Sequence, residues 1–461
     1  GQVSKRRYIV RVVVLALVAG ACGGDRGADE SGVDDASAAT TTAVAAGDTF
    51  GTLASPCGEG EGGPAPAAGV EDAQGIETDA IRVGTIADPG FSGRPGLNQE
   101  LFDAGQAFVG WCNDQGGING RPVELTEYDA AITDYAPKVR EACDREFALV
   151  GGGGAQDSEW TSTGQTCGLI DIAGFAATPE KGGVTGHDGV IERRTVQPVP
   201  NPQDEFPVGP VLDLAEEYPE ALDQVGIINA DFATLTLIAA RTKEAYEQLG
   251  ATIVSEQTYN ILGEANWAPL AGVLQEDGVE WLNFVGEGEF LAQLQQAMDE
   301  IDYHPTVTLQ DTNFYDQTYL EAAGPAADGT FVRTAFVPFE EADQNPATQQ
   351  YIDLVEGIDG KVALLGAQSM SAWLLFAQSA DQCDDDGDLT RTCVLETAAS
   401  VTEWDGGGLH APANPSTNEG PTCSVTLQVE DSAFVRYSPD EGFTCSDDAV
   451  VQLEGDYSST G

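Results

Sequence analysis

From residue 81 onward, short β-branched runs alternate with helical runs, and this alternation restricts the chain to one class of fold. Residues 81–87 read IRVGTIA, which is typical of a buried strand. The run that follows places Leu97, Leu101 and Phe108 at helical spacing and ends at two glycines. Strands and helices that alternate in this way predict a parallel sheet covered by helices.

The alternation occurs twice, and a proline-rich segment separates the two sets. Strands are expected at residues 81–87, 122–126, 147–150 and 169–173, and then at 225–229, 252–258, 281–285 and 306–309. Further helices are expected at 136–145, 159–165, 235–249, 267–276 and 290–301. Residues 198–202 read PVPNP, and these prolines exclude a helix there. We therefore expect an α/β protein with two doubly wound parallel-sheet lobes joined by crossover hinges.

The N-terminal region carries signals for export and for a tether. A basic segment at residues 5–7 precedes an apolar run at 12–21, which is too short to span a membrane because a spanning helix needs about 20 apolar residues. We expect residues 1–21 to be a signal peptide. Cys22 follows small residues as in a bacterial lipobox, and ordinary secretory cleavage is the alternative. Residues 22–75 are then a lipidated Cys and a disordered acidic tether, because large apolar side chains are scarce there.

The cysteines predict an oxidising compartment. Nine are present, and removal of Cys22 leaves an even number in an exported chain, which predicts four disulfides. The candidates are Cys57, Cys112, Cys143, Cys167, Cys383, Cys393, Cys423 and Cys445. The sequence leaves their pairing open. The local choices are Cys383 with Cys393, Cys423 with Cys445 and Cys112 with Cys143, and Cys57 with Cys167 then remains.

The charge and the missing motifs exclude several classes of protein. Lys and Arg number 20 against 76 Asp and Glu, which gives a formal net charge of −56. Nucleic acid and anionic lipid repel a chain this acidic, so neither is an expected partner. No G-x-S-x-G and no C-x-x-C motif occurs, and His187, His304 and His410 lie far apart in the sequence. We therefore expect no catalytic residues, no metal site and no cofactor.

Four motifs, in this order along the chain, resemble one family. DQGGINGRPVEL at residues 114–125 resembles the turn after the first helix of type I periplasmic binding proteins. ATPE at 177–180, RT at 194–195 and SAWLLFA at 371–377 follow in the family's order. The resemblance covers residues 76–450, nearly all of the chain after the tether. It is closest to the branched-chain amino-acid-binding subgroup that serves ABC importers.

The resemblance implies an extracytoplasmic solute-binding lipoprotein that is not an enzyme and that meets the bacterial cell membrane through its lipid anchor only. Three crossovers would assign residues 76–198 and 333–400 to lobe 1, and residues 199–332 and 401–455 to lobe 2. A small solute such as an amino acid or amide would bind between the lobes. The partner of this monomer would be the membrane permease of an ABC importer. A ligand-sensing receptor of the same fold and a secreted hydrolase are the alternatives.

Loops that leave the strands predict the binding site, because ligands of open parallel sheets bind beyond the carboxyl ends of the strands. The ligand-binding candidates from these loops are Phe91, Gly154, Ala155, Gln156, Phe175, Ala176, Ala177, Phe232, Thr234, Glu287 and Asp311. Glycines at 151–154 would let a ligand approach the backbone, and they also suit a plain turn between strand and helix. Phe91 and Arg94 would close the pocket, and a buried Arg suits an acidic ligand.

The resemblance assigns roles to some of these residues, and the sequence departs from it at two loops. The subgroup offers Ser or Thr hydroxyls to a ligand carboxylate where this chain has Gly154 and Ala155, which carry none. Ala177 stands near the position of the Thr that holds the amino-acid head group. Phe232 would be an aromatic platform or a core residue. Asp311 would balance an ammonium group or be a solvated carboxylate.

Overall fold

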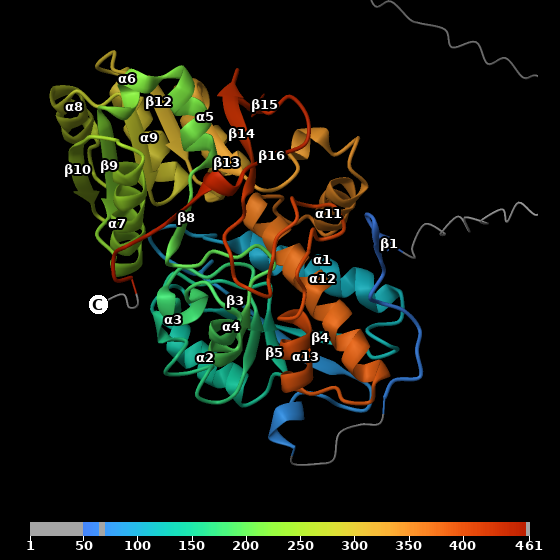
Figure 1. Cartoon of the computed structure of the whole chain (residues 1–461). Coiled ribbons are helices and arrows are strands. Elements are labelled where there is room, and N and C mark those ends of the chain that lie inside the picture. The colour runs from blue at the N-terminus through green and yellow to red at the C-terminus, as the bar shows by residue number, and fades with distance from the viewer. Residues whose placement is uncertain (1–48, 64–69, 458–461) are drawn as a thin grey trace, which may run out of the picture. The chain divides into compact units, whose positions relative to one another are not determined.

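The computed structural model of the chain describes residues 49–63 and 70–457 (Figure 1). The predicted signal peptide, Cys22 and the first part of the predicted tether lie outside the described residues. The folded chain begins earlier than the sequence suggests, because β1 (Thr49–Phe50) and β2 (Leu53–Ala54) form a small antiparallel pair. Phe50 is fully buried, and Cys57 is disulfide-bonded to Cys112. One aromatic side chain and one disulfide therefore attach a segment that composition alone marks as tether.

The first sheet has five strands among the described residues, all parallel, in the order β4-β3-β5-β6-β7. The strands are β3 (Ile81–Ala87), β4 (Val123–Asp129), β5 (Ala148–Val150), β6 (Ile170–Ile172) and β7 (Thr195–Val196). The helices between or after them are α1 (Gln99–Asp114), α2 (Tyr135–Cys143), α3 (Pro179–Gly182) and α4 (His187–Arg193). Almost every residue of β3 is buried, as a β-branched central strand between two helical layers should be.

The second sheet combines parallel and antiparallel strands in the order β10-β9-β11-β12-β13-β14-β15, with β16 paired to β14. Strands β9 to β13 pair in parallel, whereas β14 and β15 are antiparallel additions at one side. The strands are β9 (Val225–Ala230), β10 (Ile253–Tyr259), β11 (Trp281–Val285), β12 (Val307–Gln310), β13 (Thr330–Thr334), β14 (Cys423–Glu430), β15 (Ala433–Ser438) and β16 (Thr444–Cys445). The expected α/β class with parallel sheets is confirmed, and the antiparallel strands extend it.

Three of the helices around the second sheet were predicted, at residues 235–249, 267–276 and 290–301, and the other three were not. The helices are α5 (Gly209–Glu217), α6 (Pro219–Leu222), α7 (Ala233–Gln248), α8 (Ala268–Asp277), α9 (Gly288–Asp299) and α10 (Gln317–Ala323). A small ladder, β8 (Glu205–Pro207) with β17 (Val450–Gln452), joins segments far apart in the sequence. Within the described ranges, no helix is both long and apolar enough to cross a membrane.

A last group of helices returns the chain to the first sheet. These are α11 (Pro346–Glu356), α12 (Leu364–Asp385) and α13 (Arg391–Ala398). α12 lies beside α1 (Figure 1), where Trp373 stacks on Phe108 with 5.3 Å between the ring centroids. The described chain therefore passes between the two sheets after β7, after β13 and after α13. The residue boundaries of the two lobes stay a prediction.

One predicted helix is wrong. Residues 160–165 form turns that follow a short 3₁₀ helix, η2 (Asp157–Glu159). Thr161, Ser162 and Gly164 occupy this stretch, and these residue types favour turns over helix interiors.

The disulfides confirm two of the four expected pairs. Cys383–Cys393 and Cys423–Cys445 are bonded as expected. The other pairs are Cys57–Cys112 and Cys143–Cys167, so the expected pairs Cys112–Cys143 and Cys57–Cys167 are wrong. The reason is packing: the backbone N–H of Gly58 donates to Gly117, which holds the N-terminal segment against the end of α1.

Candidate ligand-binding site

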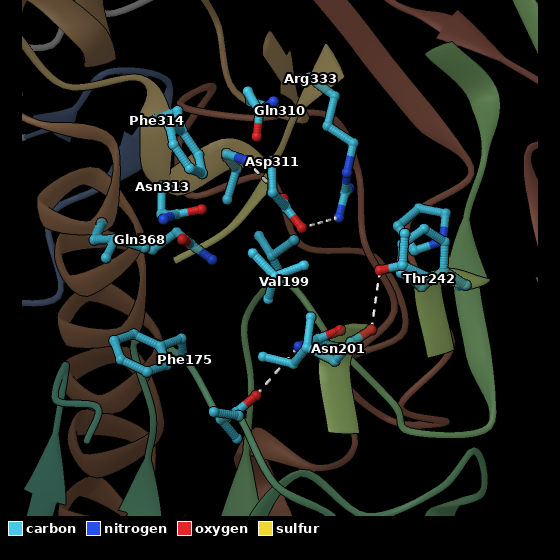
Figure 2. Close-up of a pocket in the computed structure, with 18 of the residues that line it drawn as sticks. Phe175, Val199, Asn201, Thr242, Gln310, Asp311, Asn313, Phe314, Arg333 and Gln368 are labelled. Atoms are coloured by element: carbon cyan, nitrogen blue, oxygen red, sulfur yellow. Dashed lines mark hydrogen bonds and ion pairs between the residues drawn. The ribbon is translucent and has the colours of Figure 1, made fainter. Parts of the chain in front are cut away.

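A cavity of about 280 Å³ lies where loops of the two sheets meet (Figure 2). Loops after β3, β5, β6 and β7 line it from the first sheet, and loops after β9, β11, β12 and β13 line it from the second. These loops all leave the carboxyl ends of parallel strands, the edge at which such sheets bind ligands. The volume is near the lower end of the range for small-molecule pockets, about 300 Å³.

The cavity brings together most of the predicted ligand-binding residues. Those that line it are Ala155, Phe175, Ala176, Ala177, Thr234, Glu287 and Asp311. Phe91, Gly154, Gln156 and Phe232 do not line it. Gly154 instead faces the ring of Tyr135, and Phe232 is half-buried at the start of α7. Ligand contact by the lining residues stays a prediction.

Two backbone N–H groups in the predicted ligand loops are already engaged by buried carboxylates. The N–H of Ala155 donates to Asp88 Oδ2 at 2.9 Å, and the N–H of Ala177 donates to Asp157 Oδ2 at 2.7 Å. Burial raises the pKa of Asp88, and it raises the pKa of Asp157 to about 6. The buried carboxylates therefore hold these two loops in shape. Neither of these N–H groups is free to bind a ligand carboxylate.

A fully buried ion pair supports the same loops. Lys181 Nζ lies 2.8 Å from Asp171, and both side chains are inaccessible to solvent. The ammonium group also lies 5.8 Å from the ring centre of Tyr135 and 5.6 Å from that of Trp160. Burial disfavours this charge, but attraction to Asp171 outweighs it and raises the pKa of Lys181. The pair is out of reach of a ligand and has a structural role.

Arg94 connects the two sides of the cavity. It follows β3, and its Nη1 lies 2.9 Å from Glu287 while its Nε lies 2.6 Å from Glu289. Both glutamates follow β11 of the second sheet. The Arg94 side chain is only 11% exposed, so these pairs are poorly screened by water. Sequence reasoning suggested Arg94 for an acidic ligand, but its guanidinium is already paired with these two carboxylates and also lies 3.7 Å from Asp316.

A second cation, Lys361, extends this group of charges. Its Nζ lies 3.0 Å from Glu100 and 2.6 Å from Asp316. Burial raises the pKa of Glu100, and it also raises the pKa of Glu287. We call these side chains the Arg94 cluster: Arg94, Lys361, Glu100, Glu287, Glu289 and Asp316. Carboxylates outnumber cations in it, so it does not attract an anion.

A hydrogen bond also crosses the cavity. The hydroxyl of Thr234, on the first turn of α7, donates to the carbonyl of Ala155 at 2.8 Å. The carbonyl belongs to the loop after β5 of the first sheet. With the Arg94 cluster, this contact holds the cavity closed.

On the second-sheet side of the cavity, Asp311 pairs with Arg333. Arg333 Nη2 lies 2.8 Å from Asp311 Oδ2, as the dashed line in Figure 2 marks. The other carboxylate oxygen of Asp311 accepts the N–H of Thr312 at the start of a 3₁₀ helix. The predicted counterion of a ligand ammonium group is therefore engaged by a protein cation.

A family model decides the identity of the chain. The model described as "Periplasmic binding protein" matches residues 80–433. The chain belongs to this family. The family is one of binding proteins and not of enzymes.

Solved structures of periplasmic binding proteins resemble this one in fold. A fatty acid ABC transporter substrate-binding protein from Thermomonospora curvata has a TM-score of 0.67 and 18% identity, over 82% of this chain and 95% of that one. A leucine-binding protein from Thermotoga maritima MSB8 has a TM-score of 0.63 and 14% identity, over 80% and 99%. No curated protein matches the chain in sequence. At such identities the likeness establishes the fold alone.

Several cavity residues of this periplasmic binding protein escape sequence reasoning. The crossover after β7 lines the cavity with residues 197 and 199–202, although its prolines predicted only a connection. Gln368 reaches it from α12, and its amide oxygen is buried without a hydrogen-bond partner among the described residues. Gln197 has a similarly unpartnered oxygen. The sequence gives little indication of Gln197 and Gln368, because a single Gln belongs to no recognisable motif.

The described part of the periplasmic binding protein contains no group of three His, Cys, Asp or Glu side chains that could hold a metal ion. Its polar cavity residues are carboxylates, cations, amides and the hydroxyls of Thr234, Thr242, Thr312 and Tyr246. This arrangement can bind and orient a solute.

Proposed function

We propose that this periplasmic binding protein is the extracytoplasmic solute-binding component of an ABC importer. It captures a small polar or amphipathic solute between its two lobes and delivers it to a membrane permease. The observation that carries the proposal is the cavity, which is lined by strand-end loops of both sheets and closed by contacts between them. The names of the similar solved structures, which describe ABC transporter and leucine-binding proteins, support it.

The mechanism follows from the contacts that cross the cavity. Release of the solute requires separation of Arg94 from Glu287 and of Thr234 from Ala155. The crossover segments between the sheets would act as hinges for this motion. A bound solute adds contacts that exist only when the lobes are closed, so it shifts the population toward the closed form that a permease recognises.

The solute is better described as amphipathic than as an α-amino acid. The resemblance implies that an amino-acid head group is held by the loops at residues 154–155 and 177. In this chain those positions lack hydroxyls, and the N–H groups of Ala155 and Ala177 are bound to Asp88 and Asp157. An α-carboxylate would therefore lose hydrogen bonds to water without replacement, which is costly in a closed site.

The anchor of the protein is proposed to be a lipid on Cys22, at the outer face of the cell membrane. Labelled palmitate should enter the full-length precursor in cells, and the Cys22→Ala variant should lose that label. Ser31→Ala, a change in the same segment, should keep it. Unchanged incorporation in Cys22→Ala excludes Cys22 as the anchor.

A thermal-unfolding panel tests the binding function. The purified protein is heated with amino acids, amides, short peptides, sugars and straight-chain amphiphiles. A true ligand present at about 100 times its Kd should stabilise the folded state by about 2.7 kcal/mol and raise the melting temperature. Recovery of the unchanged ligand afterwards is the control for catalysis. No shift with any compound, or consumption of one, contradicts the proposal.

A further inference from the structure

We infer that the cavity continues beyond the cleft as a channel beside α7, and that this channel takes the straight apolar chain of an amphipathic solute. The solute's head group, an uncharged hydrogen-bond donor such as a primary amide or an alcohol, binds at Gln368 in the cleft. The inference rests on the proposed function, because it names the substrate class of the same cavity.

The channel is formed by one face of α7 and the second sheet. Ile238, Thr242 and Tyr246 recur every four residues along the helix and all line the cavity. Leu309 of β12 and Asn283 of β11 line it from the sheet. Figure 2 shows Thr242 on the far side of the cavity from Gln368 and Phe175, with Val199 between. The cavity therefore has two ends with different walls.

The channel wall has little hydrogen-bonding capacity to spare. The hydroxyl of Thr242 donates to the carbonyl of Ile238 at 2.9 Å. The hydroxyl oxygen of Tyr246 accepts the indole N–H of Trp281 at 3.3 Å. The amide of Asn283 donates to the carbonyl of Leu309 at 3.1 Å. Because these polar groups are already hydrogen-bonded within the protein, an apolar chain is the ligand that costs least to bury beside them.

The ion pair near the channel is satisfied by itself. Arg333 and Asp311 neutralise each other at 2.8 Å, and Arg333 also lies over the ring of Phe206, 5.9 Å from its centre. A charged head group at this end would have to break the pair. The Arg333–Asp311 pair therefore favours the apolar chain of the solute, and not its head group, at the α7 end.

The cleft end offers acceptors that lack donors. Gln368 is 9% exposed, and its amide oxygen has no hydrogen-bond partner within the described residues. Gln197 is 2% exposed, and its amide oxygen is likewise unpartnered there. A buried acceptor without a donor is destabilising, and a ligand N–H or O–H would satisfy it. The excess of carboxylates in the Arg94 cluster, at the same end, disfavours an anionic head.

The volume limits the length of the chain. About 280 Å³ corresponds to roughly nine water molecules at about 30 Å³ each. A solute of about ten non-hydrogen atoms therefore fills the cavity, which corresponds to a medium-length chain such as that of octanamide.

Binding of a chain-length series tests the channel. The probes are butanamide, hexanamide and octanamide, measured by calorimetry on the full folded protein. Affinity should rise by roughly fourfold for each added methylene, because each buries more apolar surface. Thr242→Phe fills the channel, so it should flatten this dependence and weaken octanamide binding most. Ala240→Leu adds bulk to the exposed face of the same helix and should leave the series unchanged.

A second variant keeps the test valid if Thr242→Phe misfolds. If Thr242→Phe melts far below the wild-type protein, Ile238→Phe, at a half-buried position of the same wall, replaces it. A chain-length dependence that persists in a folded channel variant overturns the channel. A wild-type affinity that does not depend on chain length overturns it as well.

The head group has its own comparison. Octanamide should bind more tightly than octanoate, and Gln368→Met should weaken octanamide by about tenfold, the effect of losing one hydrogen bond in a buried site. Equal or tighter binding of octanoate, or an unchanged Gln368→Met affinity, overturns the assignment of the head to Gln368. Binding of another solute of the panel, such as leucine, without any chain-length effect refutes the inference alone. Binding of none of the compounds refutes the proposed function too.

Discussion

His410 is a buried residue whose two ring nitrogens are both used by neighbours. Nδ1 lies 2.8 Å from the carbonyl oxygen of Ala411. A carbonyl oxygen can only accept a hydrogen bond, so Nδ1 carries the hydrogen. Nε2 lies 2.8 Å from the hydroxyl of Ser371. The indole N–H of Trp404 donates to the same hydroxyl at 2.9 Å. Nε2 is therefore the acceptor of a neutral ring. Burial lowers the pKa of His410 to about 4, from an ordinary value of about 6.5.

This lowered pKa predicts a loss of stability in mild acid. Between about pH 6.5 and pH 4 the unfolded chain binds a proton at His410 and the folded chain does not, so the free energy of unfolding falls as the pH falls. The full effect is about 3 kcal/mol. His410→Gln should remove it, which urea unfolding at pH 7 and at pH 4.5 would measure. The comparison is made between variants, because Asp157, whose pKa is raised by burial to about 6, acts in the opposite direction.

A surface histidine supplies the control. His304→Gln makes the same substitution at an exposed side chain near Asp299. Equal losses of stability in acid for the wild-type protein and for His410→Gln would refute the role of the buried ring.

At the scale of elements, the sequence predicts local structure well and pairing poorly. The strands expected at residues 225–229 and 281–285 occur as β9 and β11, and the helix expected at 235–249 occurs as α7. Their β-branched or helical periodicity is a local property. β14 and β15 were not predicted, and neither was the ladder of β8 with β17. Such pairs depend on which distant segment the chain meets after folding, and no local pattern encodes that.

The candidate site was likewise predicted only in part. Strand ends are predictable from the sequence, so the sequence predicts the loops with Ala155, Ala177 and Thr234, and these residues line the cavity. The crossover at residues 197–202 and Gln368 of α12 were missed, because only the tertiary fold brings them to the strand ends. The sequence also does not reveal that buried carboxylates accept hydrogen bonds from the N–H groups of Ala155 and Ala177. These bonds depend on distances between side chains and backbone that only the folded structure sets.

At the scale of the whole molecule, charge and closure are linked. The chain carries a formal net charge of −56, and in the Arg94 cluster Glu100 of α1 faces three carboxylates that follow strands of the second sheet, Glu287, Glu289 and Asp316. Without the cations between them, Glu287, Glu289 and Asp316 would repel Glu100 across the cavity. Arg94 and Lys361 therefore decide whether the closed form is attractive or repulsive.

Replacement of Arg94 should favour the open form. Arg94→Gln removes the positive charge and shortens the side chain, which leaves Glu287 and Glu289 without their cation, so the closed form loses attraction and gains repulsion. The radius of gyration without ligand, from small-angle X-ray scattering, should rise, and the ligand off-rate should increase by about tenfold, as for a buried charge pair that loses one partner. Arg82→Gln is the matched control, because Arg82 is 41% exposed and pairs with Glu77 and Glu124 away from the cavity. If both variants match the wild type in radius and off-rate, the Arg94 cluster does not control closure.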